Sequence, residues 1–374
     1  MLIGVDASRA VSPKPTGTEN YSLHMIRALV RQAGAKHRFR LYLRDIPTES
    51  LLPPSENVEW RVVRPRRLWT HIGLGLELAR RPPDVLYVPA HVVPLMCRVP
   101  TVATVHDLGY RYYPRAHTAC SRWYLEWSTR HNARVAQRLI VDSKATRADL
   151  EKLLAVPSSK IAVAYPAGSG SVARVEDAER VRSIQQRYGL DGPYLMSVGT
   201  LHPRKNLELL VDAFGDLCAS PEVPPELRLV LAGKRGWLWE PLLARIRESA
   251  LTERVICTGY LSPTELSALL TGAMAMVMPS LYEGFGLPIL EAMACDTSVI
   301  CSNASSLPEV AGDAAVYVDP DDRAGLRRAM ARVLRDANLR EELVRRGRQR
   351  LTLFSWDRCA ETVLSALEEV GGRS

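Results

Sequence analysis

The sequence predicts an α/β protein built from two doubly wound parallel sheets. Three observations lead to this prediction. The chain has 374 residues, about the size of two ordinary domains. Short apolar segments typical of buried strands alternate with amphipathic helical segments. The alternation occurs once in each half, and strands joined by crossover helices run parallel, so each half should form its own sheet, with a cleft between the carboxyl ends of the strands.

In the first half, strands are expected near residues 2–6, 40–43, 59–63, 85–88, 102–105, 139–141 and 161–165. Helical patterns lie between them, such as 21–31, in which Leu23, Ile26 and Val30 share one face. In the second half, strands are expected at 194–198, 227–232, 255–257, 275–278, 299–301 and 315–318. Ser262-Pro-Thr-Glu265 is a capping box with proline at the first helical position, which predicts a helix start.

The domain boundary is expected in the small, turn-forming segment 166–171. This division gives a first domain over residues 1–170 and a second over 171–354. The last helical segment, 355–370, follows no strand of its own.

The composition is 47% hydrophobic and 24% charged, which fits a folded globular protein and excludes a disordered or coiled-coil chain. No apolar run reaches the roughly 18 residues of a membrane span, and the chain opens on a strand rather than on a basic, cleavable leader. The seven cysteines contain no Cys-x-x-Cys pair, which argues against a disulfide framework and a thiolate zinc site. A cytoplasmic location is therefore expected.

The charge is divided unequally along the chain. Residues 1–175 carry 26 Lys+Arg and 13 Asp+Glu, a net +13, and residues 176–374 carry 23 and 28, a net −5. The first half is therefore expected to face an anionic partner: a phosphorylated substrate, a phospholipid surface or nucleic acid. The excess of arginine (42 Arg, 7 Lys) also fits a simple coding bias.

Cations stand beside apolar groups in one segment of the first half. Arg64, Arg66 and Arg67 precede Leu68 and Trp69, and Ile72, Leu74, Leu76 and Leu78 follow. The pattern fits a patch at the inner membrane surface, and it fits a buried crossover helix equally well.

The densest group of chemically active residues runs from Pro279 to Cys295. A strand ends at Met278, Gly284 and Gly286 allow close backbone approach to a ligand, and Pro288 marks a helix start. The free N–H groups of such a helix start favour a diphosphate. Glu283 and Glu291 bracket this anion site, so they are placed for hydroxyl groups on either side of it. The alternative is an ordinary turn followed by a helix acid.

Arg204 and Lys205 follow another strand and are placed to hold phosphate oxygens, although a solvated basic turn is the alternative. His106-Asp107 follows the strand 102–105 and is also expected at the cleft, although a lone histidine is more often structural. Asp319, Asp321 and Asp322 resemble a metal site but fit a helix-capping turn better. No G-x-G-x-x-G or G-x-x-x-x-G-K-[ST] motif occurs.

Together these segments resemble the family-4 retaining glycosyltransferases, a group 1 family of the GT-B fold, along nearly the whole chain. The motifs that carry the resemblance occur in the family's order and lie at 17–21, 105–108, 143–150, 197–206, 283–291 and 305–310. One departure stands after Glu291, where Asp296 replaces a glycine that usually closes the helix.

The resemblance implies transfer of a sugar, such as mannose, from a nucleotide-diphosphate sugar to an acceptor hydroxyl, with retained configuration, in glycan, glycolipid or polysaccharide biosynthesis. The second domain would bind the GDP- or UDP-linked donor. The first would bind the glycan or lipid-linked acceptor, with helix 355–374 packing back on it. Arg204 and Lys205 would hold the diphosphate together with the loop residues Gly284, Phe285, Gly286 and Leu287.

By the same resemblance, Glu283 would bind hydroxyls of the donor sugar and Glu291 those of the ribose. His106 would contact the sugar from the first domain, and Gly17 would let the first loop approach the phosphates. The catalytic set would then be Glu283, His106, Arg204 and Lys205. Two cations and a helix N-terminus can stabilise the leaving diphosphate, so no metal or other cofactor is expected.

Two other classes of function remain open. A sugar-nucleotide epimerase or a phosphorylase shares the fold without this transfer. A nucleic-acid-binding protein would explain the basic half, but the sequence shows no recognised nucleic-acid module and no basic run interleaved with aromatic residues.

Overall fold

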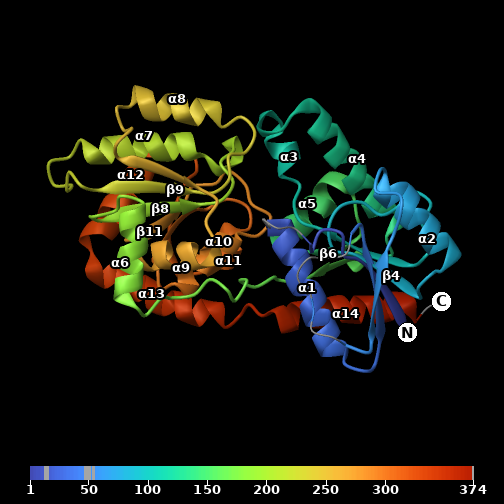
Figure 1. Cartoon of the computed structure of the whole chain (residues 1–374). Coiled ribbons are helices and arrows are strands. Elements are labelled where there is room, and N and C mark those ends of the chain that lie inside the picture. Colours follow the sequence, from blue (N-terminus) through green and yellow to red (C-terminus); the bar gives the residue numbers. More distant parts are fainter. Residues whose placement is uncertain (12–16, 46–51, 53–54, 373–374) are drawn as a thin grey trace. The chain divides into compact units, whose positions relative to one another are not determined.

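The computed structural model describes residues 1–11, 17–45, 52 and 55–372. The chain separates into two compact units, which are described one at a time (Figure 1). The first unit comprises Met1–Tyr112, Thr118–Ala167 and Phe354–Ser374, and the second comprises Tyr113–His117 and Gly168–Leu353. The break after Ala167 lies inside the small-residue segment. The grouping of Tyr113–His117 with the second unit has no signal in the sequence.

The first unit contains a seven-stranded parallel sheet with the strand order β3-β2-β1-β4-β5-β6-β7. The order reverses between β1 and β4, as in a doubly wound fold. The strands are β1 (Leu2–Asp6), β2 (Arg38–Leu43), β3 (Val58–Val62), β4 (Val85–Val88), β5 (Thr101–Val105), β6 (Arg138–Val141) and β7 (Ile161–Val163).

The second unit contains a six-stranded parallel sheet with the order β10-β9-β8-β11-β12-β13, which reverses between β8 and β11. The strands are β8 (Tyr194–Val198), β9 (Arg228–Ala232), β10 (Val255–Gly259), β11 (Ala275–Met278), β12 (Val299–Ser302) and β13 (Ala315–Val318). Every predicted strand is present, with ends that differ by two residues or fewer. The prediction of two doubly wound parallel sheets is confirmed.

Helices cover both sheets. Those of the first unit are α1 (Gly17–Ala33), the π-helix η1 (Trp69–Leu74), α2 (Gly75–Arg80), α3 (Gly109–Tyr112), α4 (Ala119–Val135), α5 (Lys144–Leu154) and α14 (Trp356–Gly371). Those of the second are α6 (Ala178–Arg187), α7 (Leu207–Cys218), α8 (Glu240–Glu248), α9 (Pro263–Gly272), α10 (Leu287–Ala294), α11 (Leu307–Ala311), α12 (Arg323–Arg335) and α13 (Ala337–Leu351). The described residues also contain the short 3-10 turns η2 (Pro114–Ala116), η3 (Ser158–Lys160) and η4 (Pro203–Lys205).

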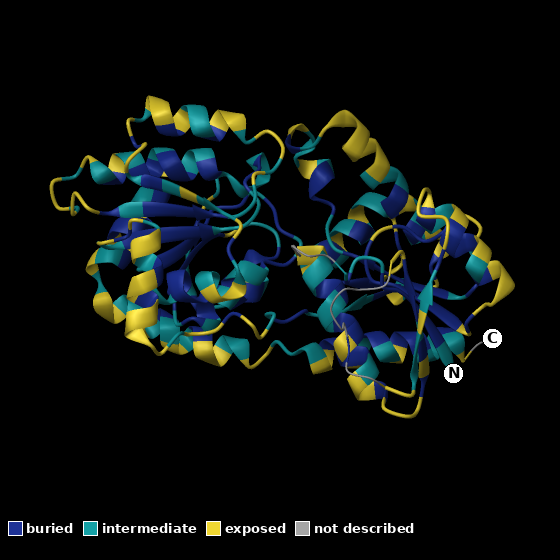
Figure 2. Ribbon diagram, viewed as in Figure 1, coloured by how far each residue is buried: buried dark blue, intermediate teal, exposed yellow. Residues whose placement is uncertain are grey.

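Burial follows the amphipathic pattern that predicted these elements. In each unit the central strands are largely buried and the edge strands β3, β7, β10 and β13 only partly, whereas the helices expose their outer faces (Figure 2). The predicted capping box is present at the start of α9: Glu265 N donates to Ser262 Oγ at 3.3 Å, and Ser262 N donates to Glu265 Oε2 at 3.0 Å. Among the described residues, no helix combines the length and apolar character needed to span a bilayer.

Helix α14 belongs to the first unit and lies alongside α1 (Figure 1). Its inner face adds Cys359, Val363, Leu367 and Val370 to the core beneath β1 and β4. On its outer side, Glu368 accepts hydrogen bonds from Lys36 Nζ at 2.5 Å and contacts His37 Nε2 at 2.8 Å. The helix therefore completes the first unit although it lies some 190 residues beyond β7.

Candidate active site

Two loops meet in the second unit at the point where the strand order reverses. The loop after β8 carries Arg204 and Lys205 in the turn η4, and the loop after β11 carries Glu283. Their backbones are joined, because Leu281 N donates to the carbonyl oxygen of Arg204 at 2.9 Å. Crevices at such switch points are the usual ligand sites of open α/β sheets. The two strongest sequence signals therefore form a single site.

Lys205 and Glu283 form an ion pair in this site. Lys205 Nζ lies 2.7 Å from Glu283 Oε1, and the two side chains are 12% and 9% exposed. Burial raises the pKa of Glu283, but the positive charges of Lys205 and Arg204 outweigh burial and lower the pKa below its ordinary value. Glu283 is therefore held as an anion. Gly199 makes room for the lysine, because a Cβ there would lie 2.9 Å from Lys205 Cε.

Asn206 ties this loop to two others. It has a positive φ of 57°, which asparagine tolerates better than most residues. Its side-chain amide donates to the carbonyl oxygens of Pro279 at 3.2 Å and Pro320 at 2.7 Å. The loops that follow β8, β11 and β13 are thereby fixed together. The sequence marked Asn206 only as the end of a motif and did not predict this role.

The glycine-rich loop between β11 and α10 is held by two serines. Ser305 Oγ lies 2.6 Å from the carbonyl oxygen of Glu283, and Ser306 Oγ lies 2.9 Å from the same oxygen and 2.8 Å from that of Phe285. In a trans peptide the N–H points opposite to the carbonyl oxygen. The N–H groups of Gly284 and Gly286 therefore point away from the two serines.

The loop needs glycine at position 286. Gly286 has a φ of 112°, and a Cβ there would lie 2.8 Å from Leu307 Cδ2. Phe285 is buried, so only its backbone could serve a ligand, whereas Leu287 is partly exposed at the first residue of α10. The predicted diphosphate-binding segment is thus a rigid loop that leads into a helix N-terminus.

Glu291 lies one turn into α10 and is partly exposed. Burial raises the pKa of its carboxyl to about 7, although the charge of Lys205 opposes this shift. Near neutral pH, Glu291 is therefore divided between a form that only accepts hydrogen bonds and a form that also donates one, and either form can bind a hydroxyl group.

The departure at Asp296 leaves the end of α10 intact. Asp296 adopts a positive φ of 56°, the conformation that glycine usually supplies. Its carboxylate pairs with Arg348 and with Arg174, whose Nη1 lies 3.0 Å away. Hydrogen bonding to Arg348 and Arg174 lowers the pKa of this carboxyl. Asp296, which is less favourable than glycine in this backbone conformation, is thus held by two ion pairs.

The aspartates at 319–322 form a turn and a helix cap. Asp322 Oδ1 accepts from Gly325 N at 2.7 Å at the start of α12, and Asp319 Oδ1 accepts from Asp321 N at 2.9 Å. This confirms the capping interpretation. Within the part of the chain that the structure describes, no group of three or more His, Cys, Asp or Glu side chains is arranged to hold a metal ion.

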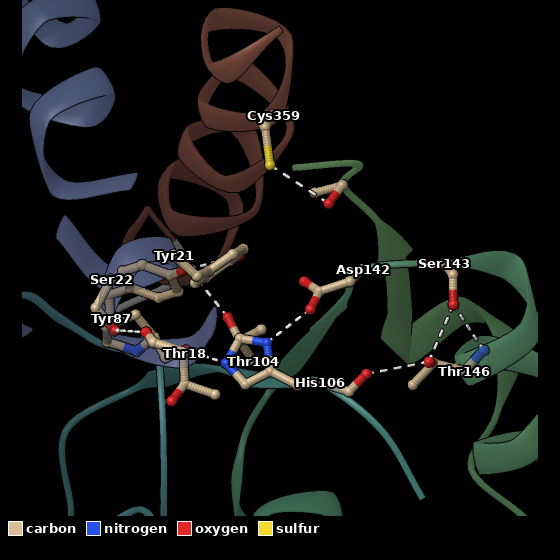
Figure 3. Close-up of polar contacts among 12 residues, drawn as sticks. Thr18, Tyr21, Ser22, Tyr87, Thr104, His106, Asp142, Ser143, Thr146 and Cys359 are labelled. Carbon is tan, nitrogen blue, oxygen red and sulfur yellow. Dashed lines mark hydrogen bonds and ion pairs between the residues drawn. The ribbon is translucent and has the colours of Figure 1, made fainter. Parts of the chain in front are cut away.

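His106 lies in the first unit, directly after β5, between residues that follow the two neighbouring strands. Its Nδ1 is 2.6 Å from Asp142 Oδ2, after β6, and its Nε2 is 3.0 Å from the carbonyl oxygen of Pro89, after β4. Figure 3 shows the Asp142 carboxylate facing the imidazole. The Tyr21 ring and the imidazole pack in a T-shaped arrangement, with ring centroids 4.8 Å apart. The sequence did not single out Asp142, although its place directly after a strand was a usable signal.

Gly17, also in the first unit, is the exposed first residue of α1. A Cβ at this position would meet nothing within 4 Å. Packing among the described residues therefore gives no reason for glycine here, and its expected role beside the phosphates stays a prediction.

Two doubly wound units, with a cationic site at the switch point of the second, are the architecture expected of a glycosyltransferase of the GT-B type. The model of the family described as "Glycosyltransferase Family 4" matches residues 15–167, and that of "Glycosyl transferases group 1" matches residues 182–350. The O-antigen chain mannosyltransferase B of Escherichia coli is 32% identical over 269 residues, which are 71% of this chain and 69% of that protein. The chain therefore belongs to the family-4, group 1 glycosyltransferases.

Solved structures share the fold at low sequence identity. Sucrose-phosphate synthase from Thermosynechococcus elongatus matches with a TM-score of 0.78 and 21% identity over 100% of both chains. HepE from Anabaena, in complex with UDP and glucose, matches with a TM-score of 0.75 and 17% identity over 98% of this chain and 99% of that one. Several further mannosyltransferase relatives match over only 22–28% of their own length. These findings favour the transferase over the epimerase and nucleic-acid alternatives.

Proposed function

We propose that this glycosyltransferase transfers mannose from GDP-mannose to a hydroxyl of a growing polysaccharide, with retention of the anomeric configuration. The observation that carries the proposal is the buried pairing of Lys205 with Glu283 beside the N-terminus of α10. Mannose and a polysaccharide acceptor are suggested by the O-antigen chain mannosyltransferase among its relatives.

The diphosphate is the group that gains negative charge as the sugar leaves. Arg204, Lys205 and the N-terminus of α10 supply positive charge in fixed positions, which is the arrangement that stabilises such a leaving group. These groups take the role that a divalent metal ion plays in other transferases. When the diphosphate binds, Lys205 gains a second anionic partner, and Glu283 is released in part to accept from sugar hydroxyls.

The pairing of Glu283 also bears on the stereochemistry. A carboxylate held by Lys205 at 2.7 Å is a weak nucleophile, which disfavours a covalent glycosyl intermediate on Glu283. In the mechanism that we propose, the acceptor oxygen attacks C1 from the face that the diphosphate leaves. The C1–O bond to phosphate breaks, the new C1–O bond forms, and the acceptor proton passes to a diphosphate oxygen. The configuration at C1 is then retained.

We further propose that the acceptor lies at the cytoplasmic face of an anionic membrane, and one face of the first unit supports this proposal. The exposed side chains of this apolar face are Leu68, Ile72, Leu76, Leu95 and Met96, the last 82% exposed. Most of them border an open hollow of about 1070 Å³ between η1–α2 and the segment 95–100. Trp69, Leu74 and Leu78 of the same segment are buried, so it serves both as a crossover helix and as an exposed apolar face.

Exposed arginines stand beside this apolar face, among them Arg64, Arg67 and Arg98. Cations next to exposed apolar groups complement anionic phospholipids, to which each basic residue near the surface adds about 1 kcal/mol. The hollow is lined by Asp84 and Pro100, which precede β4 and β5, whereas His106 follows β5. The hollow thus lies at the amino ends of β4 and β5, whereas His106 lies at the carboxyl end of β5, so a membrane docked there would not cover His106.

Two measurements test the proposal. The first is thermal unfolding with GDP, UDP and ADP, in which GDP at 100 times its Kd should stabilise the protein by about 2.7 kcal/mol, whereas UDP and ADP do so only at far higher concentration. The second is the anomeric coupling constant of the product, which should be that of an α-linked mannoside. A β-linked product would overturn retention, and selective stabilisation by UDP would overturn the choice of donor.

A further inference from the structure

The register of the first sheet places a histidine and a carboxylate side by side. Val105 of β5 pairs with Val141 of β6, so the next residues, His106 and Asp142, leave the sheet at the same level. The imidazole is then enclosed by Asp142 on one side and by the Pro89 carbonyl on the other. Thr146 Oγ1 donates to the backbone carbonyl of His106 at 3.2 Å, which fixes the main chain as well (Figure 3).

These contacts restrict where protons can be. A backbone carbonyl only accepts hydrogen bonds, so the Nε2 atom of His106, 3.0 Å from Pro89 O, carries a hydrogen. Nδ1 lies 2.6 Å from Asp142 Oδ2, and two lone pairs do not face each other at that distance. A second proton is therefore shared between Nδ1 and Oδ2. The ring has no lone pair with which to take a proton from an acceptor hydroxyl.

The surroundings of Asp142 keep that shared proton in place. The other carboxylate oxygen, Oδ1, is buried and has no hydrogen-bond partner among the described residues, so the carboxylate depends on His106 for its stabilisation. Burial raises the pKa of Asp142. Burial lowers the pKa of His106, but the charge of Asp142 and its hydrogen bond outweigh burial, so that pKa is raised as well. Both shifts oppose loss of the proton.

The other titratable groups around the pair reinforce this balance. Asp107 raises the pKa of both partners. Tyr21 from α1, Tyr87 from β4 and Cys359 from α14 are buried, which raises the pKa of each, so they stay neutral near pH 7. His91 also faces the pair, and burial lowers its pKa to about 4, so it is neutral as well.

We propose that Asp142 is a positioning residue for the transfer reaction, which orients His106 and holds it protonated so that the imidazole acts only as a hydrogen-bond donor and not as a general base. The inference rests on the glycosyltransferase activity and adds to it. A donor at Nε2 suits a sugar hydroxyl oxygen, which could share that hydrogen with the Pro89 carbonyl. The acceptor proton must then go elsewhere, in agreement with its transfer to the diphosphate.

The first test is an NMR titration of the free protein, with the His106 ring resonances assigned through His106→Gln. In the wild-type protein the ring nitrogens should not titrate between pH 5.5 and pH 8. In Asp142→Asn the ring should lose its second proton at a lower pH, within this range, because the charge and the hydrogen bond of Asp142 are lost, whereas burial still lowers the pKa and only Asp107 and the Pro89 carbonyl oppose it. A wild-type ring that titrates near its ordinary pKa of about 6.5 would overturn the proposal, whether or not the variant folds. No substrate is needed, so this outcome is independent of the proposed donor and acceptor.

The second test is the pH dependence of kcat/KM. The ratio of Asp142→Asn to wild-type kcat/KM should fall about tenfold between pH 5.5 and pH 8, since a neutral imidazole donates more weakly than a charged one. The matched control is Tyr87→Phe. It removes the hydroxyl between Tyr21 and Thr104, at 3.3 and 3.0 Å, without touching either ring nitrogen. The ratio of Tyr87→Phe to wild-type kcat/KM should be constant with pH. An equally constant ratio for Asp142→Asn would show that Asp142 has only a structural role.

Discussion

Lys205 Nζ lies 2.7 Å from Glu283 Oε1, although the two residues are 78 positions apart in the chain. They belong to different motifs, one after β8 and one after β11, which the sequence assigned to the diphosphate and to the sugar, respectively. In the structure each is the other's charge partner. The two recognition tasks are therefore coupled, because any anion that attracts Lys205 also changes the environment of Glu283.

Replacing Lys205 by Met should destabilise the protein by about 3–5 kcal/mol, because it leaves Glu283 buried with less compensation. Adding Glu283→Gln should recover much of this loss, and denaturant unfolding of the two single variants and the double variant measures it. Turnover should fall about 10²-fold for Lys205→Ala or Arg204→Ala, as for loss of one preorganised charge. In the double variant turnover should stay low although stability returns.

Lys234→Met is the matched control, since Lys234 lies over the Tyr260 ring at 5.1 Å instead of beside a buried carboxylate. Lys234→Met should lower the free energy of unfolding by about 1 kcal/mol or less. If Lys205→Met retains full stability and turnover, the basic pair belongs to an ordinary solvated turn.

Glu291→Gln should change stability in a pH-dependent way. Between its unfolded pKa of 4.5 and its folded value of about 7, the native carboxyl keeps a proton that the unfolded chain releases, so wild-type stability falls as pH rises through this window. Glutamine has no such proton. The variant should therefore gain up to about 3 kcal/mol over the wild type above pH 7 and nothing below pH 4. Thermal unfolding at pH 4 and pH 8 measures the difference.

The sign should be opposite at Glu342 on α13, because hydrogen bonds from Arg345 and Arg346 lower the pKa of that carboxyl to about 2. Glu342→Gln should therefore lose stability relative to the wild type at pH 8. An equal effect of Glu291→Gln at both pH values would contradict a raised pKa at Glu291. Glu291→Gln should also bind the donor nucleotide more weakly, on the expectation from the family resemblance that Glu291 binds the ribose hydroxyls.

Activity should be unchanged in excess EDTA, because in the function that we propose Arg204, Lys205 and the N-terminus of α10 stabilise the diphosphate without a metal ion. Asp321→Asn should be close to wild type in turnover. Asp322→Ala should lose only about 1 kcal/mol of stability, through the cap of α12. Activity abolished by EDTA and restored by Mg²⁺ or Mn²⁺ would show that the diphosphate site needs a metal.

The apolar face of the first unit should bind anionic membranes. Co-sedimentation with phosphatidylglycerol vesicles should weaken strongly for Arg64→Ala/Arg67→Ala and for Met96→Ser, and phosphatidylcholine vesicles should bind none of the proteins. The matched control is Arg180→Ala/Arg182→Ala on α6, which removes the same charge from exposed positions of the second unit. Binding that is absent, or that both double variants weaken equally, would count against this surface.

The sequence predicted the elements and most of the site because both depend on local patterns. Short apolar segments that alternate with helical segments located every strand, and the glycines and proline of 284–288 located the loop that leads into α10. What it could not predict are contacts set by register and by long-range packing. Asp142 becomes the partner of His106 only because β5 and β6 are neighbours with Val105 opposite Val141. The pairing of Lys205 with Glu283 likewise depends on the reversal of strand order between β8 and β11.

The alternation at 72–78 was ambiguous for a physical reason. Ile72 and Leu76, four residues apart, share the exposed face of this helical segment, whereas Leu74 and Leu78 share the buried face, so apolar side chains lie on both faces. The chain passes there from the π-helix η1 into α2. Because both faces are apolar, the hydrophobic pattern alone could not show which face packs into the core and which stays exposed.

Because α14 supplies part of the core of the first unit, that unit is assembled from both ends of the described chain. During synthesis, residues 168 to 353 are made before α14. The second unit is therefore complete before the first. Until α14 is synthesised, the part of the first unit's core that Cys359, Val363 and Leu367 cover stays exposed. Its half-made core is then exposed to chaperones and proteases for the time needed to translate about 200 further residues, roughly 10–40 s at typical rates.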